Sequence, residues 1–268
     1  MGDNQIMDYW QKQSHEKPLF EELTWDKPER KDQAGKLLIV GGNVHGFAAP
    51  AKAFEYCTQA GIGNARICLP DSLRRTLHTF WTDAIFCPST PSGSFAQDSR
   101  ELILNNSLWS DGIIFPGDLG RNSETAIMLD ELMASLTLPI AITKDALDYF
   151  LPRPKLLFDR PDTLVVASFS ELQKLCSTYG MATPLTFTMS LVNLIEALHA
   201  LTQKIPASII TKFNDKFIVA VAGFISTTDA PADEEIWRLE IASKAIVNWL
   251  HFPNKQFEAL THSVLISS

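Results

Sequence analysis

Two glycine-rich segments and one aspartate, each directly after an apolar run, are the residues best suited to bind a phosphate-bearing ligand. In the first segment, Gly41–Pro50, the apolar run Leu37–Val40 stops at two glycines, and a helical pattern begins at Pro50. Glycine lets backbone approach a ligand closely, and a helix N-terminus supplies N–H donors for an anion. The segment has neither the G-x-G-x-x-G pattern nor the G-K-[ST] of a P-loop. It predicts a phosphate-binding turn or, equally, a tight connection between a strand and a helix.

The second segment, Pro116–Asn122, contains two glycines and an arginine immediately before a helical pattern. Backbone N–H groups, the helix dipole and the Arg121 guanidinium would together bind an anion there. The alternative is a glycine-containing loop with an arginine on the surface. Asp145 follows another apolar run, where its carboxylate would bind a hydroxyl or a magnesium-bound water, or would cap the helix that follows.

Short apolar runs alternate with helical patterns along the chain, and this predicts a mainly parallel sheet with helices on both faces. In such sheets ligands bind beyond the carboxyl ends of the strands, so the segments above are expected to meet at one edge. Expected helices are Pro50–Ala60, Ser123–Leu136, Leu191–Thr202, Glu234–Leu250 and a helical C-terminus over Gln256–Ile266. Expected strands are Leu37–Val40, Arg66–Leu69, Ala84–Cys87, Gly112–Phe115, Ile140–Thr143, Thr163–Ala167, Ser208–Lys212 and Phe217–Ala222.

Composition limits the classes of partner. The 268 residues are 46% hydrophobic, which is enough for one large domain, and the formal net charge is -8. No stretch is densely basic, so no nucleic-acid partner is expected. No apolar run is long enough for a membrane span, and the first residues are not those of a signal peptide. Four cysteines without a C-x-x-C pair favour buried thiols in a reducing, cytoplasmic setting and no metal site.

The first 35 residues differ from the rest because they are polar with scattered aromatic side chains. We interpret residues 1–35 as an N-terminal arm and residues 36–268 as one α/β domain. The aromatic residues of the arm, Tyr9, Trp10, Phe20 and Trp25, would attach it to the domain or to a second subunit, which leaves a homo-oligomer open.

Three stretches carry a resemblance to a known family. "GKLLIVGGNVHGFAAPAKA", "IIFPGDLGRNSETAIMLDEL" and "IAITKDALDYF" resemble, in order and spacing, the ADP/ATP-dependent NAD(P)H-hydrate dehydratases of the ribokinase-like superfamily. The match covers residues 28–150 well and becomes faint beyond them. The resemblance implies a ribokinase-like three-layer αβα sandwich. It also implies that ADP or ATP, with Mg²⁺, drives removal of water from hydrated NADH or NADPH.

The resemblance also implies a set of site residues. Asp145 corresponds to the final aspartate of the family's L-D-A-D-A-L, and with Asp229 it is a candidate catalytic residue. The ligand would be a small molecule, either related to NAD(P)H or a nucleotide. The implied substrate-binding residues are Asn43, His45, Ala49, Gly117, Gly120 and Ser168, and the implied nucleotide-binding residues are Lys212 and Gly223.

The sequence departs from the family pattern at positions that the family uses for substrate binding, nucleotide binding and catalysis. Ser168 stands where the family has a substrate-binding histidine, and Phe213 replaces the glycine of its L-K-G loop. The family's G-[ST]-G-D, which forms an anion hole and supplies the base, is absent. After Gly223, Asp229, Asp233 or Glu234 is the acid that would approach the position of the missing base. Losing a general base removes about 10²–10⁴ in rate.

Three functions therefore remain open from the sequence. The first is a divergent nucleotide-dependent dehydratase or small-molecule kinase. The second is a non-catalytic protein of the same fold that binds a nucleotide or a nicotinamide-like ligand. The third is a structural protein whose arm and helical C-terminus bury themselves in a partner subunit.

Overall fold

One sheet of ten strands organises the described residues, in the order β1-β10-β9-β8-β7-β6-β5-β2-β3-β4. The structure, a computed structural model, describes residues 8–79, 81–230 and 237–265. Strand β9 is antiparallel to both of its neighbours, and the other neighbouring pairs are parallel. The strands are β1 Trp10–Gln13, β2 Lys36–Val40, β3 Asn64–Pro70, β4 Ile85–Cys87, β5 Gly112–Phe115, β6 Ile140–Thr143, β7 Thr163–Ser168, β8 Ser208–Phe213, β9 Lys216–Val221 and β10 Phe224–Asp229.

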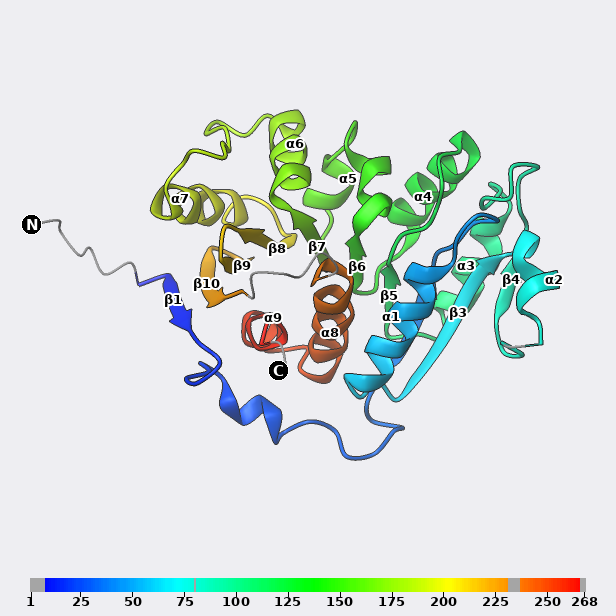
Figure 1. Cartoon of the computed structure of the whole chain (residues 1–268), viewed down its shortest axis with the longest axis horizontal. Coiled ribbons are helices and arrows are strands. Elements are labelled where there is room, and N and C mark those ends of the chain that lie inside the picture. Colours follow the sequence, from blue (N-terminus) through cyan, green and yellow to red (C-terminus); the bar gives the residue numbers. More distant parts are fainter. Residues whose placement is uncertain (1–7, 80, 231–236, 266–268) are drawn as a thin grey trace, which may run out of the picture.

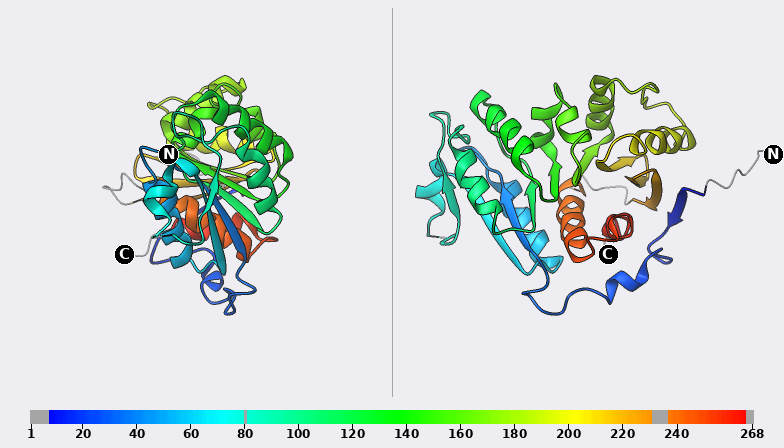
Figure 2. Two further views of the ribbon diagram at one scale, coloured as in Figure 1. Left: turned by 90° about the vertical axis from the view of Figure 1, so that its right-hand side faces the viewer. Right: turned by 180° about the vertical axis from the view of Figure 1, so that it is seen from behind.

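Helices cover both faces of this sheet, which gives the three-layer αβα sandwich predicted from the sequence (Figures 1 and 2). One buried cluster joins a sheet face to α3–α7, and a second joins the other face to α1, α2, α8 and α9. The helices are α1 Ala48–Gln59, α2 Arg74–Leu77, α3 Ser99–Ser107, α4 Ser123–Ser135, α5 Lys155–Phe158, α6 Phe169–Tyr179, α7 Leu191–Thr202, α8 Trp237–His251 and α9 Gln256–Ser263, with 3₁₀ segments η1 Glu21–Thr24, η2 Asp71–Leu73 and η3 Lys144–Phe150.

The expected elements are present, with shifts of a few residues at their ends. All eight expected strands occur, and the helix expected at Leu191–Thr202 is α7 with the same bounds. The helix expected at Glu234–Leu250 is α8, and residues 234–236 lie outside the described part. The sequence reading missed β1, β10, α2, α3, α5 and α6. The two missed strands are polar: β1 is the edge strand and β10 lies next to it, and neither has the continuous apolar pattern by which the buried parallel strands were predicted.

The N-terminal arm is attached to the domain, as its aromatic residues suggest. β1 pairs with β10, with Trp10 opposite Ile225, and the Trp10 Nε1–H donates to Thr227 Oγ1 at 3.0 Å. The Tyr9 ring stacks on His199 with 3.6 Å between centroids. Because β1 completes the edge of the sheet (Figure 1), the arm belongs to the fold rather than lying loosely on it. Trp25 is the exception, since 81% of it is exposed.

The four cysteines are buried and unbridged. Burial raises the pKa of the Cys57 and Cys176 thiols to about 12. The pKa of Cys68 is raised well above its usual value by its hydrogen bond with Cys87 and by burial. Thiolate is the reactive species. We therefore expect native protein to react with a thiol reagent such as dithiobis(nitrobenzoate) at least a hundredfold more slowly than protein unfolded in urea. Fast labelling of one thiol in native protein would contradict this burial.

None of the described helices has the length and apolar character that a membrane span needs. The described residues also contain no group of three or more His, Cys, Asp or Glu side chains placed to hold a metal ion.

Candidate functional site

The carboxyl edge of the sheet brings the two glycine-rich segments into direct contact. β2 and β5 are neighbours, so the loops that follow them meet. The Gly42 N–H donates to the Gly117 carbonyl at 3.3 Å, and Asn43 Nδ2 donates to the Asp118 carbonyl at 2.6 Å. A Cβ on Gly41 would lie 2.7 Å from the Gly117 carbonyl oxygen, so only glycine allows this approach. The two loops therefore lie together, but they bond to each other.

Asp118 occupies the N-terminus of α1, where an anionic ligand was expected. Its backbone is left-handed, with φ of 58°, and one carboxylate oxygen accepts the Ala49 N–H at 2.7 Å. The next residue, Pro50, has no N–H, and the Ala51 N–H donates to the Phe47 carbonyl. A carboxylate at this position is favoured by the positive end of the helix dipole. The chain thus supplies its own anion to the first turn of α1.

Asp145 holds the second glycine-rich segment in place. Its two carboxylate oxygens accept the N–H groups of Asp118 at 2.8 Å and of Leu119 at 3.1 Å. Burial raises the Asp145 pKa and the nearby Asp118 carboxylate raises it further, while the N–H donors oppose the shift. Asp145 lies in the first turn of η3, whose N-cap position is Thr143 and not Asp145. The expectation that Asp145 caps this helix is therefore wrong, and both of its oxygens are engaged.

The N-terminus of α4 is closed in the same way. The Asn122 side chain accepts the N–H groups of Glu124 and Thr125. The Asn122 N–H donates to the Tyr149 hydroxyl at 3.2 Å, and that hydroxyl donates to the Gly120 carbonyl at 2.9 Å. The expected anion site on these backbone donors is therefore not supported, because internal acceptors take them.

At the carboxyl ends of β7 and β8, the residues expected to bind substrate and nucleotide also make internal contacts. Ser168 caps α6 in a reciprocal capping box with Glu171, and Glu171 forms an ion pair with Arg238 of α8. Lys212 lies opposite Ser168 in the strand register, with its Nζ 5.7 Å from the Phe217 ring centroid. The Phe213 ring lies 4.7 Å from that of Phe169. An aromatic pair thus fills the position where the family has its glycine.

The structure does not bring Asp229 and Gly223 to the glycine-rich loops. Asp229 ends β10, near the far edge of the sheet, and forms an ion pair with Lys216. Gly223 lies in the turn between β9 and β10, at the amino edge, because β9 runs antiparallel. Its carbonyl accepts from His199 Nδ1 at 2.5 Å. Asp233 and Glu234 lie outside the described residues.

Of the expected substrate-binding residues, His45 is the one with an exposed side chain. It lies between the half-buried Gly46 and the exposed Val44, and Phe47 beside them is also half-buried. The His45 N–H donates to Asn43 Oδ1 at 2.8 Å, so Asn43 fixes the loop with both ends of its amide. Ala49 is buried.

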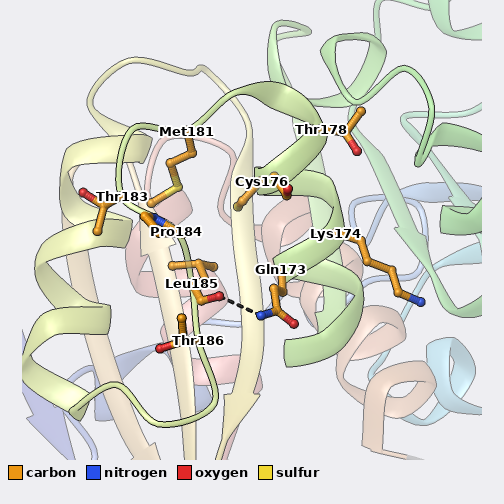
Figure 3. Close-up of a pocket in the computed structure, with 10 residues that line it drawn as sticks. Gln173, Lys174, Cys176, Thr178, Met181, Thr183, Pro184, Leu185 and Thr186 are labelled. Carbon is orange, nitrogen blue, oxygen red and sulfur yellow. Dashed lines mark hydrogen bonds between the residues drawn. The ribbon is translucent and has the colours of Figure 1, made fainter.

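A cavity of about 540 Å³ lies elsewhere, between α6 and the segment 181–186. Figure 3 shows Gln173 reaching across it to the Leu185 carbonyl at 2.7 Å, while Lys174 points away from that segment. Its lining is mostly threonine, proline and apolar side chains, without a carboxylate or a histidine. It offers no chemistry of the expected kind.

Sequence reasoning missed Asp118, Tyr149 and the Glu171–Arg238 pair. Asp118 carried a detectable signal, because an aspartate directly after a glycine in a turn tolerates positive φ and accepts backbone N–H bonds. The other contacts join segments far apart in the chain, so local patterns do not reveal them.

Comparison with known proteins gives the fold its class. No family profile and no curated protein sequence matches the chain. A ribokinase-like superfamily protein from Enterococcus faecalis V583 matches with a TM-score of 0.71 at 15% identity, over 98% of this chain and 88% of that one. ADP/ATP-dependent NAD(P)H-hydrate dehydratase from Bacillus subtilis, co-crystallised with ATP and Mg²⁺, gives 0.59 at 12% identity, over 92% and 86%. Phosphomethylpyrimidine kinase from Clostridium difficile 630 gives 0.52 at 11% identity, over 86% and 97%. The chain therefore has a ribokinase-like fold.

Proposed function

We propose that this protein binds a small nicotinamide-like ligand at the carboxyl edge of its sheet and does not catalyse nucleotide-dependent dehydration. One observation carries the proposal: the Asp118 carboxylate takes the Ala49 N–H at the first turn of α1. A ligand phosphate would have to displace this carboxylate and would meet the second carboxylate, Asp145, bound to the same loop. Two like charges at such short range repel.

The described residues do not fit the nucleotide and Mg²⁺ that the fold's relatives suggest. The phosphate cradle expected at Gly117–Gly120 is bound to Asp145, and Phe213 packs where a glycine would leave room. What remains accessible is the exposed side chain of His45, in the same loop as the half-buried Phe47. Planar rings of this kind stack on a nicotinamide or another flat heterocycle. We therefore infer that the protein recognises the heterocyclic ring of the ligand rather than its phosphates.

Calorimetry with NADH, NADPH, ADP and ATP, each with and without Mg²⁺, tests the proposal. We expect binding of NADH or NADPH, at least fivefold weaker in His45→Ala and unchanged in His15→Ala, which removes an exposed histidine of the arm. In the same samples, hydrated NADH with ADP or ATP is expected to recover its nicotinamide absorbance no faster than without protein. The absence of a binding heat with both NADH and NADPH would contradict the binding proposal.

Accelerated recovery of that absorbance would instead establish the divergent dehydratase. Lys212 and Ser168, paired at the carboxyl ends of β8 and β7, are the residues that this alternative would use.

A further inference from the structure

A second cavity lies beneath the N-terminal arm, away from the glycine-rich loops. It measures about 310 Å³, and it lies where the arm passes the C-terminal end of α1 and the helices α8 and α9 (Figure 1). Because α1 runs from the carboxyl edge of the sheet back toward the amino edge, this cavity and the candidate site are at opposite ends of that helix. Its lining is Thr24, Lys27, Gln59, Ala60, Lys244, Asn248, His262, Ser263 and Leu265.

Basic side chains line this cavity from three separate elements. Lys27 comes from the arm, Lys244 from α8 and His262 from α9. Burial lowers the Lys27 pKa, and the charge of Lys244 lowers it further. Burial likewise lowers the His262 pKa, with Lys27 adding to the effect and Glu22 opposing it. These groups therefore repel one another across the cavity.

The compensating negative charge is incomplete. Lys244 is bonded to Glu240 at 2.5 Å, one turn away on α8. Among the described residues, Lys27 has no carboxylate within ion-pair distance. A half-buried ammonium next to a second one, without a paired anion, costs free energy. An anion placed in the cavity would remove that cost.

The cavity wall also contains polar atoms that lack partners. Asn248 is only 4% exposed, and its Oδ1 has no hydrogen-bond partner among the described residues. The buried Nδ1 of His262 likewise lacks a partner within the described part of the chain. Buried polar groups in folded proteins are nearly always paired, so such atoms call for a partner. Both atoms are shielded from the cavity itself, so a ligand there would contact Lys27 and Lys244 rather than these two atoms.

We propose that this cavity binds a small phosphate-bearing ligand, with its phosphate between Lys27, Lys244 and His262. Lysine binds phosphate as a point charge, whereas planar, bidentate recognition of a carboxylate uses arginine. The lining contains two lysines and no arginine. The charge of a phosphate monoester, which approaches two at neutral pH, matches the charges of the two lysines, whereas one carboxylate carries a single charge.

Binding would also hold the arm on the domain. Thr24 and Lys27 belong to the arm, and the other polar lining residues belong to α1, α8 and α9. The Thr24 hydroxyl lies 3.5 Å from His262 Nε2, at the limit of a hydrogen bond. A ligand that bridges Lys27 and Lys244 adds a contact between the arm and α8.

Thermal melts and ³¹P NMR titrations with inorganic phosphate and glycerol 3-phosphate test this site. Ionic strength is held constant with KCl, and malonate serves as the dicarboxylate comparison. We expect both phosphate compounds to raise the Tm of the full chain saturably. Glycerol 3-phosphate and inorganic phosphate should bind with similar affinity, because both present a phosphate group to the same two lysines. Malonate should bind at least tenfold more weakly than the ester.

Lys27→Met separates binding from a purely structural role. This variant keeps the length of the side chain but removes the repulsion with Lys244, so its Tm without ligand should equal or exceed that of the wild type. Its affinity for glycerol 3-phosphate should fall at least tenfold. Lys155→Met, an exposed lysine of α5, is the matched control and should bind like the wild type. Equal responses of the two variants, or equal binding of malonate, would overturn the proposal, as would the absence of any saturable shift.

Discussion

Asp145→Ala is expected to lower the free energy of unfolding by about 2–4 kcal/mol, because it removes the acceptor for two backbone N–H groups at once. Asp118 and Leu119 both donate to this carboxylate. A hydrogen bond to a charged group contributes about 1.5–3 kcal/mol, and a buried donor left without a partner costs about 1–3 kcal/mol. The cost of burying the carboxylate, which raises its pKa, offsets part of this.

Urea unfolding at neutral pH measures the effect, with Asp148→Ala as the matched control. Asp148 lies in the same 3₁₀ segment but is exposed, so its replacement should change the free energy of unfolding by less than about 0.5 kcal/mol. Equal effects of the two substitutions would show that Asp145 does not hold the Gly117–Gly120 loop.

The pH dependence of the same carboxylate has a definite sign. Because the folded-state pKa of Asp145 is raised above 3.8, the folded protein binds this proton more tightly than the unfolded chain does. The contribution of Asp145 to stability therefore falls as pH rises from the unfolded-state pKa through the folded-state pKa, and is constant above it. The stability advantage of the wild type over Asp145→Asn, which does not titrate, should shrink across this window in urea unfolding. An advantage that grows with pH would mean that the pKa is lowered instead.

Gly117→Ala is expected to lower the free energy of unfolding by about 3 kcal/mol or more, for two separate reasons. Gly117 has φ of 115°, and an added Cβ would lie 2.3 Å from Asp145 Oδ1. Strained backbone contributes about 1–3 kcal/mol, and the contact pushes away the carboxylate that holds the loop. The change should also alter the site, because Gly117 bonds to Gly42.

Gly180→Ala separates these two reasons. Gly180 ends α6 with φ of 85°, and a Cβ there would have nothing within 4 Å. Its replacement carries the backbone strain without the contact and is expected to cost about 1 kcal/mol. If thermal or urea unfolding gives the same loss of stability for both variants, the close packing of Gly117 against Asp145 does not contribute to the free energy of unfolding.

The parallel core of the fold could be predicted because its strands are buried on both faces. Gly112–Phe115 and Ile140–Thr143 are continuous apolar runs, and the structure has strands with these bounds. β1 and β10 could not be found in this way. The sequence of β1 is WQKQ and that of β10 is FISTTD, and the polar side chains of these strands are bonded to each other and to α9.

The contact between the two glycine-rich loops could be predicted from the strand order. The hydrogen-bond partners of their backbone N–H groups could not. Parallel strands place consecutive loops at one edge, which is why Asn43 and Asp118 lie in contact. Whether a backbone N–H at that edge faces a ligand or an internal acceptor depends on side chains such as Asp118 and Asp145. Those choices depend on distances of a few ångströms between segments distant in sequence, and residue types alone do not give them.

The pairing of β1 with β10 has a consequence for synthesis on the ribosome. Trp10 pairs with Ile225, so the first strand of the chain has no partner until the β9–β10 hairpin has been translated. At a translation rate of about 5–20 residues per second, roughly ten to forty seconds pass between the synthesis of β1 and that of its partner strand β10. During that time, the indole and phenol of the arm are available to chaperones.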